Sequence, residues 1–570
     1  MSDLPHEVAR RMALKGIACL LLPQTAGCAH ETKPICPNSP VISDRDAPLT
    51  IDVHAHVFNG RDLQIQAFLT QVAGSQKSEL SDLVSGLGSA FLQALAWSMA
   101  PGAPEERRAI VRYQSASQEI CRRPDALRAA AAPSFEDGYQ RGLTQLKLAK
   151  AQIQATPESR HVLGPRDDRE GEGIGAAIDE LPARYEDYLK TKNDQASIMG
   201  SQPHVVGYLD FVFHHFNYRH VNALDYLQTY SGKSMRKVDL LIASMVDYDY
   251  WLANGRSTPT TLEEQVDLMS QVSELTQGRV HGFVPFCPFR EILTRRGTEP
   301  GASMRLVKRA ILEQGCIGVK LYPPMGFAPW GNASLNIWRG KKGLPPAAAD
   351  PTFGRQLDEA MERLFIWCLE EDVPVMAHTN RSNAPFEDFR ALAGAEYWER
   401  ALQRFKGLRV NFGHFGDTDL EDHEGKVSDG FVRLMSRNSA AAGSRAFADS
   451  SYFAGVLTQA PAVTKTLLNL YAKSDQDVLV ERLMYGSDWT MILPQKRVDQ
   501  YLAEFIEVMT QIQHELRPRP PVSGSLTDAF FGRNATAYLG LAKGAKARGR
   551  LESFYARRRV ATPDWMRKVG

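Results

Sequence analysis

The stretch Thr50-Ile-Asp-Val-His-Ala-His-Val57 decides how the rest of the chain is interpreted. It is predicted to be a β-strand in which Asp52, His54 and His56 point to one side and the apolar residues between them point to the other. Two imidazoles on one face of a strand are typical of a metal site, because neutral imidazole is the commonest metal ligand. A polar strand face without a metal gives the same pattern, so the pair alone does not decide.

Seven further apolar runs of strand length follow, each near a chemically distinctive residue. They span 239–247, 279–286, 316–321, 373–378, 408–414, 445–450 and 483–488. Helical patterns lie between them, at 261–276, 303–313, 353–371, 391–404 and 460–473. Short buried strands that alternate with helices indicate parallel β/α units. With residues 50–57 the count is eight, and the sequence therefore predicts an α/β fold, a (β/α)8 TIM barrel.

The segment 61–235 lacks this alternation, and its patterns predict a large, mostly helical insertion after the first strand. Three histidines within it, His214, His215 and His220, are expected to form an aromatic-rich packing surface outside the site. The predicted organisation is then a first barrel strand at 49–60, the insertion at 61–235 and the rest of the barrel at 236–545. Residues 546–570 are predicted to be a basic, solvated tail.

The N-terminal residues resemble an export signal. Arg10-Arg-Met-Ala-Leu-Lys15 resembles a twin-arginine motif, and a short apolar core, 16–22, follows it. Thr25-Ala-Gly-Cys28 resembles a lipobox, with Thr where Leu is usual. We therefore expect residues 1–28 to direct export to the periplasm or to a lipid anchor at Cys28, followed by a linker at 29–48. Without such a signal the protein would be cytoplasmic.

Composition excludes several kinds of partner. The 570 residues carry a net charge of +1, which gives no overall field that would favour nucleic acid. No stretch approaches the ~20 apolar residues needed to span a bilayer, so a lipid anchor would be the only membrane contact. The seven cysteines contain no CxxC pair and predict no zinc knuckle. A small-molecule substrate is the expected partner, and an oligomer stays open.

Reactive residues gather at the ends of the predicted strands. They are His54 and His56, Lys320, His378, His414 and Asp488. In a TIM barrel the C-terminal ends of all the strands meet at one mouth, so these side chains are expected to lie close together. Four histidines, one lysine and one aspartate at a single rim are hard to assign to core packing, and they predict a metal-dependent site.

The segments around these residues resemble the amidohydrolase superfamily, nearest to its amidohydrolase-2 branch. They are Asp52-Val-His-Ala-His56, Gly318-Val-Lys-Leu-Tyr-Pro-Pro324, Pro374-Val-Met-Ala-His378, Phe412-Gly-His-Phe-Gly416 and Tyr485-Gly-Ser-Asp-Trp489. Phe531-Gly-Arg-Asn-Ala-Thr536 resembles the closing Asn-Ala element of that branch. The resemblance covers 48–60 and about 236–541, but not 61–235, and so leaves substrate choice open.

The resemblance implies a role for each of these residues. His54, His56, His378 and Asp488 would bind a divalent metal, with Zn²⁺ expected, and Asp488 would also be the catalytic base. His414 would either polarise the substrate or bind a second metal. Lys320 would be a ligand only if it were carbamylated between two metals, because an ammonium cannot ligate; otherwise it would face a substrate carboxylate. We favour one ion, and expect Asp52 to support the site rather than bind metal.

The expected activity is hydrolysis of a C–N or C–O bond, as in an amide, lactone or related ester, by a metal-activated water. A decarboxylase of an aromatic or unsaturated acid would use the same ligands, and a non-enzymatic, surface-anchored binding protein is a third alternative. The loops above the rim are expected to bind the substrate. Arg290 and Arg381 are candidates for a carboxylate, and Tyr322 and Trp338 for a ring.

Overall fold

The computed structural model describes most of the chain from residue 46 onward. The described ranges are 46–68, 97, 100–120, short pieces between 136 and 187, 214–215, 217–230, 235–381, 383–416, 426–436, 445–474, 478–495, 497–516 and 525–569. The predicted signal at 1–28, and all of the linker at 29–48 except its last three residues, lie outside them. No described helix is both long and apolar enough to cross a membrane.

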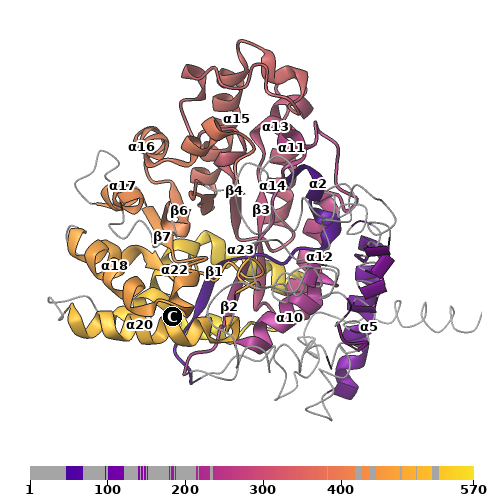
Figure 1. Ribbon diagram of the computed structural model, residues 1–570, viewed down its shortest axis with the longest axis vertical. Helices are drawn as coiled ribbons and strands as arrows, with labels where there is room; N and C mark the ends of the chain where they lie inside the picture. Colours follow the sequence, from indigo (N-terminus) through magenta and orange to yellow (C-terminus); the bar gives the residue numbers. More distant parts are fainter. Residues whose placement is uncertain are drawn as a thin grey trace, which may run out of the picture. The chain divides into compact units, whose positions relative to one another are not determined.

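Eight parallel strands form one sheet in sequence order (Figure 1). They are β1 (Ile51–Ala55), β2 (Leu240–Ser244), β3 (Val280–Pro285), β4 (Gly318–Leu321), β5 (Val375–His378), β6 (Arg409–Gly413), β7 (Arg445–Asp449) and β8 (Leu483–Met484). Val53 N donates to Tyr485 O over 3.1 Å and Asp488 N donates to His54 O over 2.8 Å, which joins the last strand to the first. The predicted TIM barrel is confirmed.

Helices follow the strands and pack around them, as Figure 1 shows. They include α12 (Leu262–Leu275), α14 (Ala302–Leu312), α15 (Phe353–Glu370), α16 (Ala395–Arg404), α17 (Lys426–Met435), α18 (Ala460–Lys473) and α20 (Tyr501–Glu515). Helix α12 shows why they form. The Thr261 side chain accepts from Glu264 N and the Glu264 side chain accepts from Thr261 N, a capping box that satisfies two free donors. The apolar residues at helical spacing are buried against the sheet.

Strand β1 contains a register shift that the sequence did not predict. Asp52 pairs with Leu241, but Ala55 pairs with Ala243, so three steps along β1 oppose two steps along β2. Such an extra residue changes which side chains face inward. Val53 joins the apolar cluster inside the barrel, and His54 also turns inward, whereas Asp52 contacts Tyr226 on the outside. The predicted common face of Asp52, His54 and His56 is therefore wrong for Asp52.

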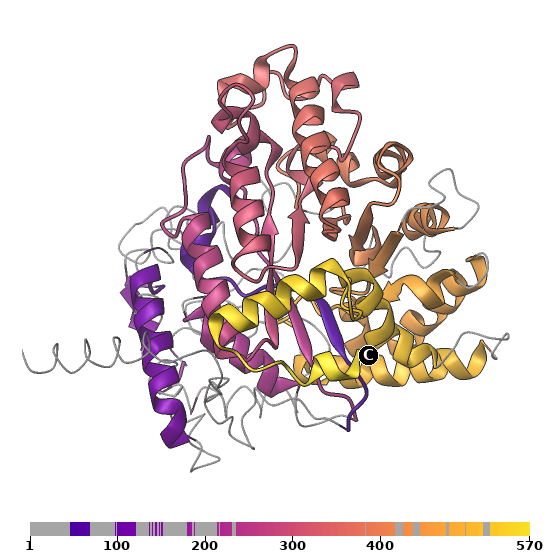
Figure 2. The same cartoon turned by 180° about the vertical axis from the view of Figure 1, so that it is seen from behind.

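The predicted solvated tail is instead a packed part of the barrel. Helix α23 (Lys546–Arg558) buries Leu551, Phe554 and Tyr555 in the cluster that also holds Ile51 and Leu240. Figure 2 shows this helix, in yellow, lying across the strands. Tyr555 Oη lies 2.6 Å from His281 Nε2 on β3. The basic residues of α23 lie mainly on its exposed face, which hid the apolar spacing in the sequence.

The insertion is helical where it is described, in α5 (Ala103–Ile120) and α10 (Arg219–Thr229). A buried ion-pair network ties both helices to the turn after β1. Arg219 lies 2.9 Å from Glu106 of α5 and 3.1 Å from Asp62 of that turn. Because a buried charge is costly unless it is paired, this network fixes α10 beside β1.

Candidate metal centre

The six side chains predicted to meet at the barrel mouth lie together there, and all are buried. One candidate ligand atom from each of His54, His414 and Asp488 lies within 4.8 Å of the other two. The other three are close to members of this group. His56 Nε2 lies 3.2 Å from Asp488 Oδ1, His378 Nδ1 lies 3.0 Å from His414 Nε2, and Lys320 Nζ lies 2.9 Å from His54 Nε2.

Hydrogen bonds assign the tautomers of the two histidines on and after β1. His54 Nδ1 lies 3.1 Å from Asp449 Oδ2, and His56 Nδ1 lies 2.8 Å from the Ser244 carbonyl oxygen. Because a carboxylate and a carbonyl only accept, each Nδ1 carries the hydrogen. The Nε2 atom of each neutral ring then carries no hydrogen and directs its lone pair at the site, as a metal ligand requires.

A second chain of hydrogen bonds assigns the tautomer of His378 and leaves its Nε2 without a hydrogen. His414 Nδ1 lies 3.1 Å from the Ser451 carbonyl oxygen and donates to it, so His414 Nε2 accepts from His378 Nδ1. His378 Nε2 is buried and has no hydrogen-bond partner among the residues that the structure describes. Buried polar atoms are rarely left in this way, so this nitrogen indicates a missing ligand. Both nitrogens of His414 are engaged.

The charges at the centre fit a cation. Burial, with the charge of Lys320, lowers the pKa of His54 to about 3, and burial with His414 lowers the pKa of His378 well below its usual value. Burial acts to raise the pKa of Asp488, but the contact with His56 and the nearby imidazoles hold it below its ordinary range. A carboxylate oxygen that faces an imidazole lone pair at 3.2 Å needs a proton or a cation between them. Neutral imidazoles and an ionised carboxylate are the states that bind metal.

Lys320 lies among these candidate ligands. Its Nζ lies 2.9 Å from His54 Nε2 and 3.2 Å from Met376 Sδ. Burial lowers the pKa of Lys320 to about 8, although Asp488 and Asp449 act in the opposite direction. The amine therefore donates to the lone pair that His54 would offer to a metal ion.

Asp449 and Ser451 belong to the centre but were missed in the sequence. Asp449 accepts from His54 Nδ1, from His414 N at 3.1 Å and from Ser451 Oγ at 2.6 Å, and Ser451 Oγ lies 2.8 Å from His54 Nδ1. The signal was present, because Asp449 ends β7 as the other site residues end their strands. Asp449 orients a histidine and is not itself one of the predicted ligands.

The backbone at the centre is strained at two predicted site residues. His414 has φ 65° and Asp488 has φ 55°, in the left-handed region that costs a side-chain-bearing residue about 1–2 kcal/mol. Such conformations persist where the surroundings impose them. Here His414 N donates to Asp449 and Asp488 N donates to His54 O. Gly413 leaves room for His54, since a Cβ there would lie 2.8 Å from His54 Cε1.

Of the four residues predicted to bind substrate, one lies at the site, two make structural contacts elsewhere and one is exposed. Tyr322 lies at the site, with its ring stacked 4.1 Å from that of His378. Trp338 is buried and donates to Gly326 O at 2.6 Å, which makes it a packing residue of the loop after β4. Arg290 is neutralised by Asp247 and Asp249, each at 2.6 Å, so its predicted role in binding a carboxylate is also replaced by a structural one. Arg381 is exposed after β5.

The histidines set aside as a packing surface do pack, but beside the site. The ring of His214 lies 5.8 Å from that of Trp489, and His215 Nε2 lies 3.4 Å from Thr490 Oγ1. Both contacts are to the two residues that follow Asp488. The insertion therefore reaches the loop that carries the predicted catalytic carboxylate.

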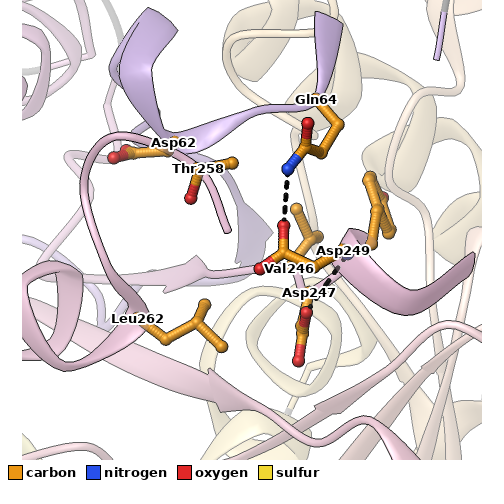
Figure 3. Close-up of a pocket in the computed structure, with 8 residues that line it drawn as sticks. Asp62, Gln64, Val246, Asp247, Asp249, Thr258 and Leu262 are labelled. Carbon is orange, nitrogen blue, oxygen red and sulfur yellow. Dashed lines mark hydrogen bonds between the residues drawn. The ribbon is translucent and has the colours of Figure 1, made fainter. Parts of the chain in front are cut away.

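A small polar pocket lies beyond the C-terminal end of β2 (Figure 3). Gln64 Nε2 donates to Asp249 Oδ1 at 2.9 Å, as Figure 3 shows, and Asp247 and Tyr248 also line the pocket. Burial and the charge of Asp247 raise the pKa of Asp249 to about 6. Tyr248 also contacts Tyr322, with ring centroids 5.1 Å apart, and so links this pocket to the wall of the metal centre.

Comparison with known proteins supports this assignment of the barrel. Residues 295–541 match a family model described as Amidohydrolase, whereas a search of curated proteins found no match. One similar solved structure is a protein assigned as a 2-pyrone-4,6-dicarboxylic acid hydrolase from Pseudomonas putida (17% identity, 55% of this chain and 86% of that chain, TM-score 0.32). Another is an uncharacterised TIM-barrel protein from Bordetella bronchiseptica (12% identity, 63% and 92%, TM-score 0.34).

A third is a 5-carboxyvanillate decarboxylase from Novosphingobium aromaticivorans, complexed with manganese (14% identity, 62% of this chain and 91% of that chain, TM-score 0.28). The fold assignment rests on the strand order of this chain and not on these similarities. The family match over residues 295–541, together with the eight-stranded barrel and the strand-end segments, supports the resemblance of this barrel to the amidohydrolase-2 branch of the amidohydrolase superfamily.

Proposed function

We propose that this protein is a metal-dependent hydrolase that uses an activated water to cleave a C–N or C–O bond of a small molecule, such as an amide, lactone or related ester. The observation that carries the proposal is the set of hydrogen bonds that leaves the Nε2 atoms of His54 and His56 without hydrogens beside the carboxylate of Asp488, and that leaves His378 Nε2 without a partner among the described residues. The family match supports an enzyme.

His54, His56, His378 and Asp488 would together hold one divalent ion. Three imidazole nitrogens and one carboxylate oxygen suit Zn²⁺, and the same donors also accept other divalent transition metals. When bound, such an ion supplies Lewis acidity, which lowers the pKa of a water ligand toward about 7.

Asp488 is the proposed general base. It is ionised, and its Oδ1 faces the imidazole nitrogens at the centre of the site, so it can accept the proton of the attacking water. The same carboxyl group then returns this proton to the leaving nitrogen or oxygen. His414 holds His378 in its tautomer by accepting from His378 Nδ1, and it would polarise a substrate oxygen after Nε2 takes up a proton, because only an N–H can donate to that oxygen.

Decarboxylation of an aromatic or unsaturated acid would require a different proton transfer from these groups. It requires a proton to be delivered to carbon, whereas Asp488 is placed and charged as an acceptor. Hydrolysis is therefore the first choice, and the two reactions leave different products.

Metal analysis of the purified full-length protein, followed by reaction with a panel of lactones, amides and aromatic acids in ¹⁸O-labelled water, tests the proposal. We expect stoichiometric divalent metal and a product carboxyl group that carries the label. Asp488→Asn and His54→Ala should lose activity, while Asp388→Asn, an exposed matched control, should keep it. Release of CO₂ without label incorporation would show a decarboxylase, and wild-type protein without bound metal would contradict both enzymatic assignments.

A further inference from the structure

Helix α10 lies outside the segment matched by the family, yet it reaches the strand that carries the first two proposed ligands. Tyr226, on this helix, is fully buried, and its hydroxyl donates to Asp52 Oδ2 over 2.5 Å. Asp52 is itself fully buried, on the side of β1 that faces α10.

Asp52 connects the backbone of two strands. Its Oδ1 accepts from the backbone N–H of His54 at 3.1 Å and from that of Ser487, also at 3.1 Å. His54 is a proposed ligand, and Ser487 immediately precedes Asp488, another. One carboxylate thus sets the spacing of the two chain segments between which the ion would lie.

The ring of Tyr226 also packs, from outside the barrel, against the segment that carries Asp488. It packs edge-on against Trp489 with centroids 5.3 Å apart, and Trp489 directly follows Asp488. Tyr230, one helical turn further along, packs on Trp489 at 5.8 Å, but its hydroxyl donates elsewhere, to Val498 O at 2.8 Å. The two tyrosines therefore share their packing partner and differ in what their hydroxyl groups bind.

We propose that Tyr226 is a positioning residue of the metal centre, and that α10 therefore helps to hold the metal ligands in place. The proposal rests on the metal binding proposed above. Removing the hydroxyl would leave Asp52 Oδ2 without its donor in a site closed to water, which costs free energy that only a shift of the carboxylate can recover. Such a shift changes the spacing of His54 and Asp488. Loss of a group that orients ligands typically weakens metal binding by about 10–100-fold.

The test compares Tyr226→Phe with Tyr230→Phe in the full chain. The apo proteins are titrated with Zn²⁺ against a chelating dye and with Co²⁺, whose visible spectrum reports ligand geometry. We expect Tyr226→Phe to raise the Kd for Zn²⁺ by about tenfold or more and to alter the Co²⁺ spectrum. Tyr230→Phe, which also loses one buried hydroxyl, should keep the wild-type Kd and spectrum even where its Tm falls.

Equal Kd values for wild type and Tyr226→Phe, or the same loss in both variants, would overturn the inference. Because Tyr226 is argued to act through Asp52, its substitution should cost less metal affinity in an Asp52→Asn background than in wild type; additive effects would count against it. If Tyr226→Phe is insoluble, hydrogen exchange of the wild type replaces it. Metal should then protect peptide 219–229 but not peptide 395–404, and an unprotected 219–229 would overturn the inference. A wild type that binds neither ion would overturn the proposed function instead.

Discussion

Replacing Asp449 with asparagine should disable His54 as a metal ligand without changing His54 itself. Asp449 Oδ1 accepts from Ser451 Oγ, Ser451 N and His414 N at 2.6 to 3.1 Å, and its Oδ2 accepts from Asn411 Nδ2 at 2.6 Å and His54 Nδ1 at 3.1 Å. An asparagine would keep its oxygen on the side with three donors. Its NH₂ group would then face Asn411 and His54, where two donors already point.

Asn411 can relieve its conflict by turning its amide, since its own Oδ1 has no partner among the described residues. The acceptor that remains near Nδ1 is the Ser451 hydroxyl, at 2.8 Å, and His54 can otherwise relieve its conflict by moving the hydrogen from Nδ1 to Nε2. The nitrogen that faces the site would then carry a hydrogen and could not ligate. The expected loss in metal affinity is about 10–100-fold, or about 1.4–2.8 kcal/mol.

The assay is Zn²⁺ competition against a chelating dye, with kcat/KM measured on any substrate found. Asp358→Asn is a matched control, because Asp358 is also buried and accepts four hydrogen bonds, at 2.9 to 3.0 Å, from residues 331–333, where Asp449 accepts five. It lies away from the imidazoles and should lower stability while metal affinity stays unchanged. If Asp449→Asn binds Zn²⁺ as tightly as wild type, the tautomer argument is wrong.

Four further outcomes are expected. Burial lowers the pKa of His281 to about 4 from its ordinary 6.5, so the stability that its neutral form contributes above pH 6.5 is lost as the pH falls toward 4. Between pH 8 and pH 5 this loss is about 2 kcal/mol. The urea midpoint of His281→Gln should therefore fall less over this pH range than that of the wild type. Phe554→Ala should lower the free energy of unfolding by about 3–5 kcal/mol, while Ser553→Ala, on the exposed side of α23, should change it by about 0.5 kcal/mol or less. Metal analysis should find one ion per chain, and intact mass should show Lys320 without an added carboxyl group; two ions and a modified lysine would contradict the mononuclear centre. In a bacterial host, Cys28→Ala should abolish lipid labelling of the full chain, and an unlabelled wild type would argue against the export signal.

The features predicted from the sequence were those with a local signature. Each buried strand is a short apolar run, and each site residue at a strand end interrupts that run with a polar side chain. His378 and His414, for example, close β5 and follow β6. A parallel barrel turns this local regularity into a spatial one, because it gathers all the strand ends at one mouth. Six residues spread over more than four hundred positions could therefore be placed together.

The features that were missed depend on partners distant in the chain. Arg290 looked available for a substrate because nothing near it in sequence neutralises it, whereas its carboxylates lie on the loop after β2. The tail at 546–570 looked solvated because six of its residues are arginines, yet Leu551, Phe554 and Tyr555 fall on one helical face and pack in the cluster that holds Ile51 and Leu240. No residue type signals the extra residue in β1, which arises from pairing with β2.

That extra residue also explains why the metal centre lies at the junction of β8 and β1. Strand β8 has only two residues, so the ring is closed beyond it by hydrogen bonds from Val53 N to Tyr485 O and from Asp488 N to His54 O. Asp488 forms its bond in a left-handed conformation whose cost of about 1–2 kcal/mol is comparable with the gain from one hydrogen bond. In that conformation its carboxylate faces His56. Closing the barrel and presenting the ligands therefore depend on the same few residues, and Asp52 and Tyr226 hold them from outside.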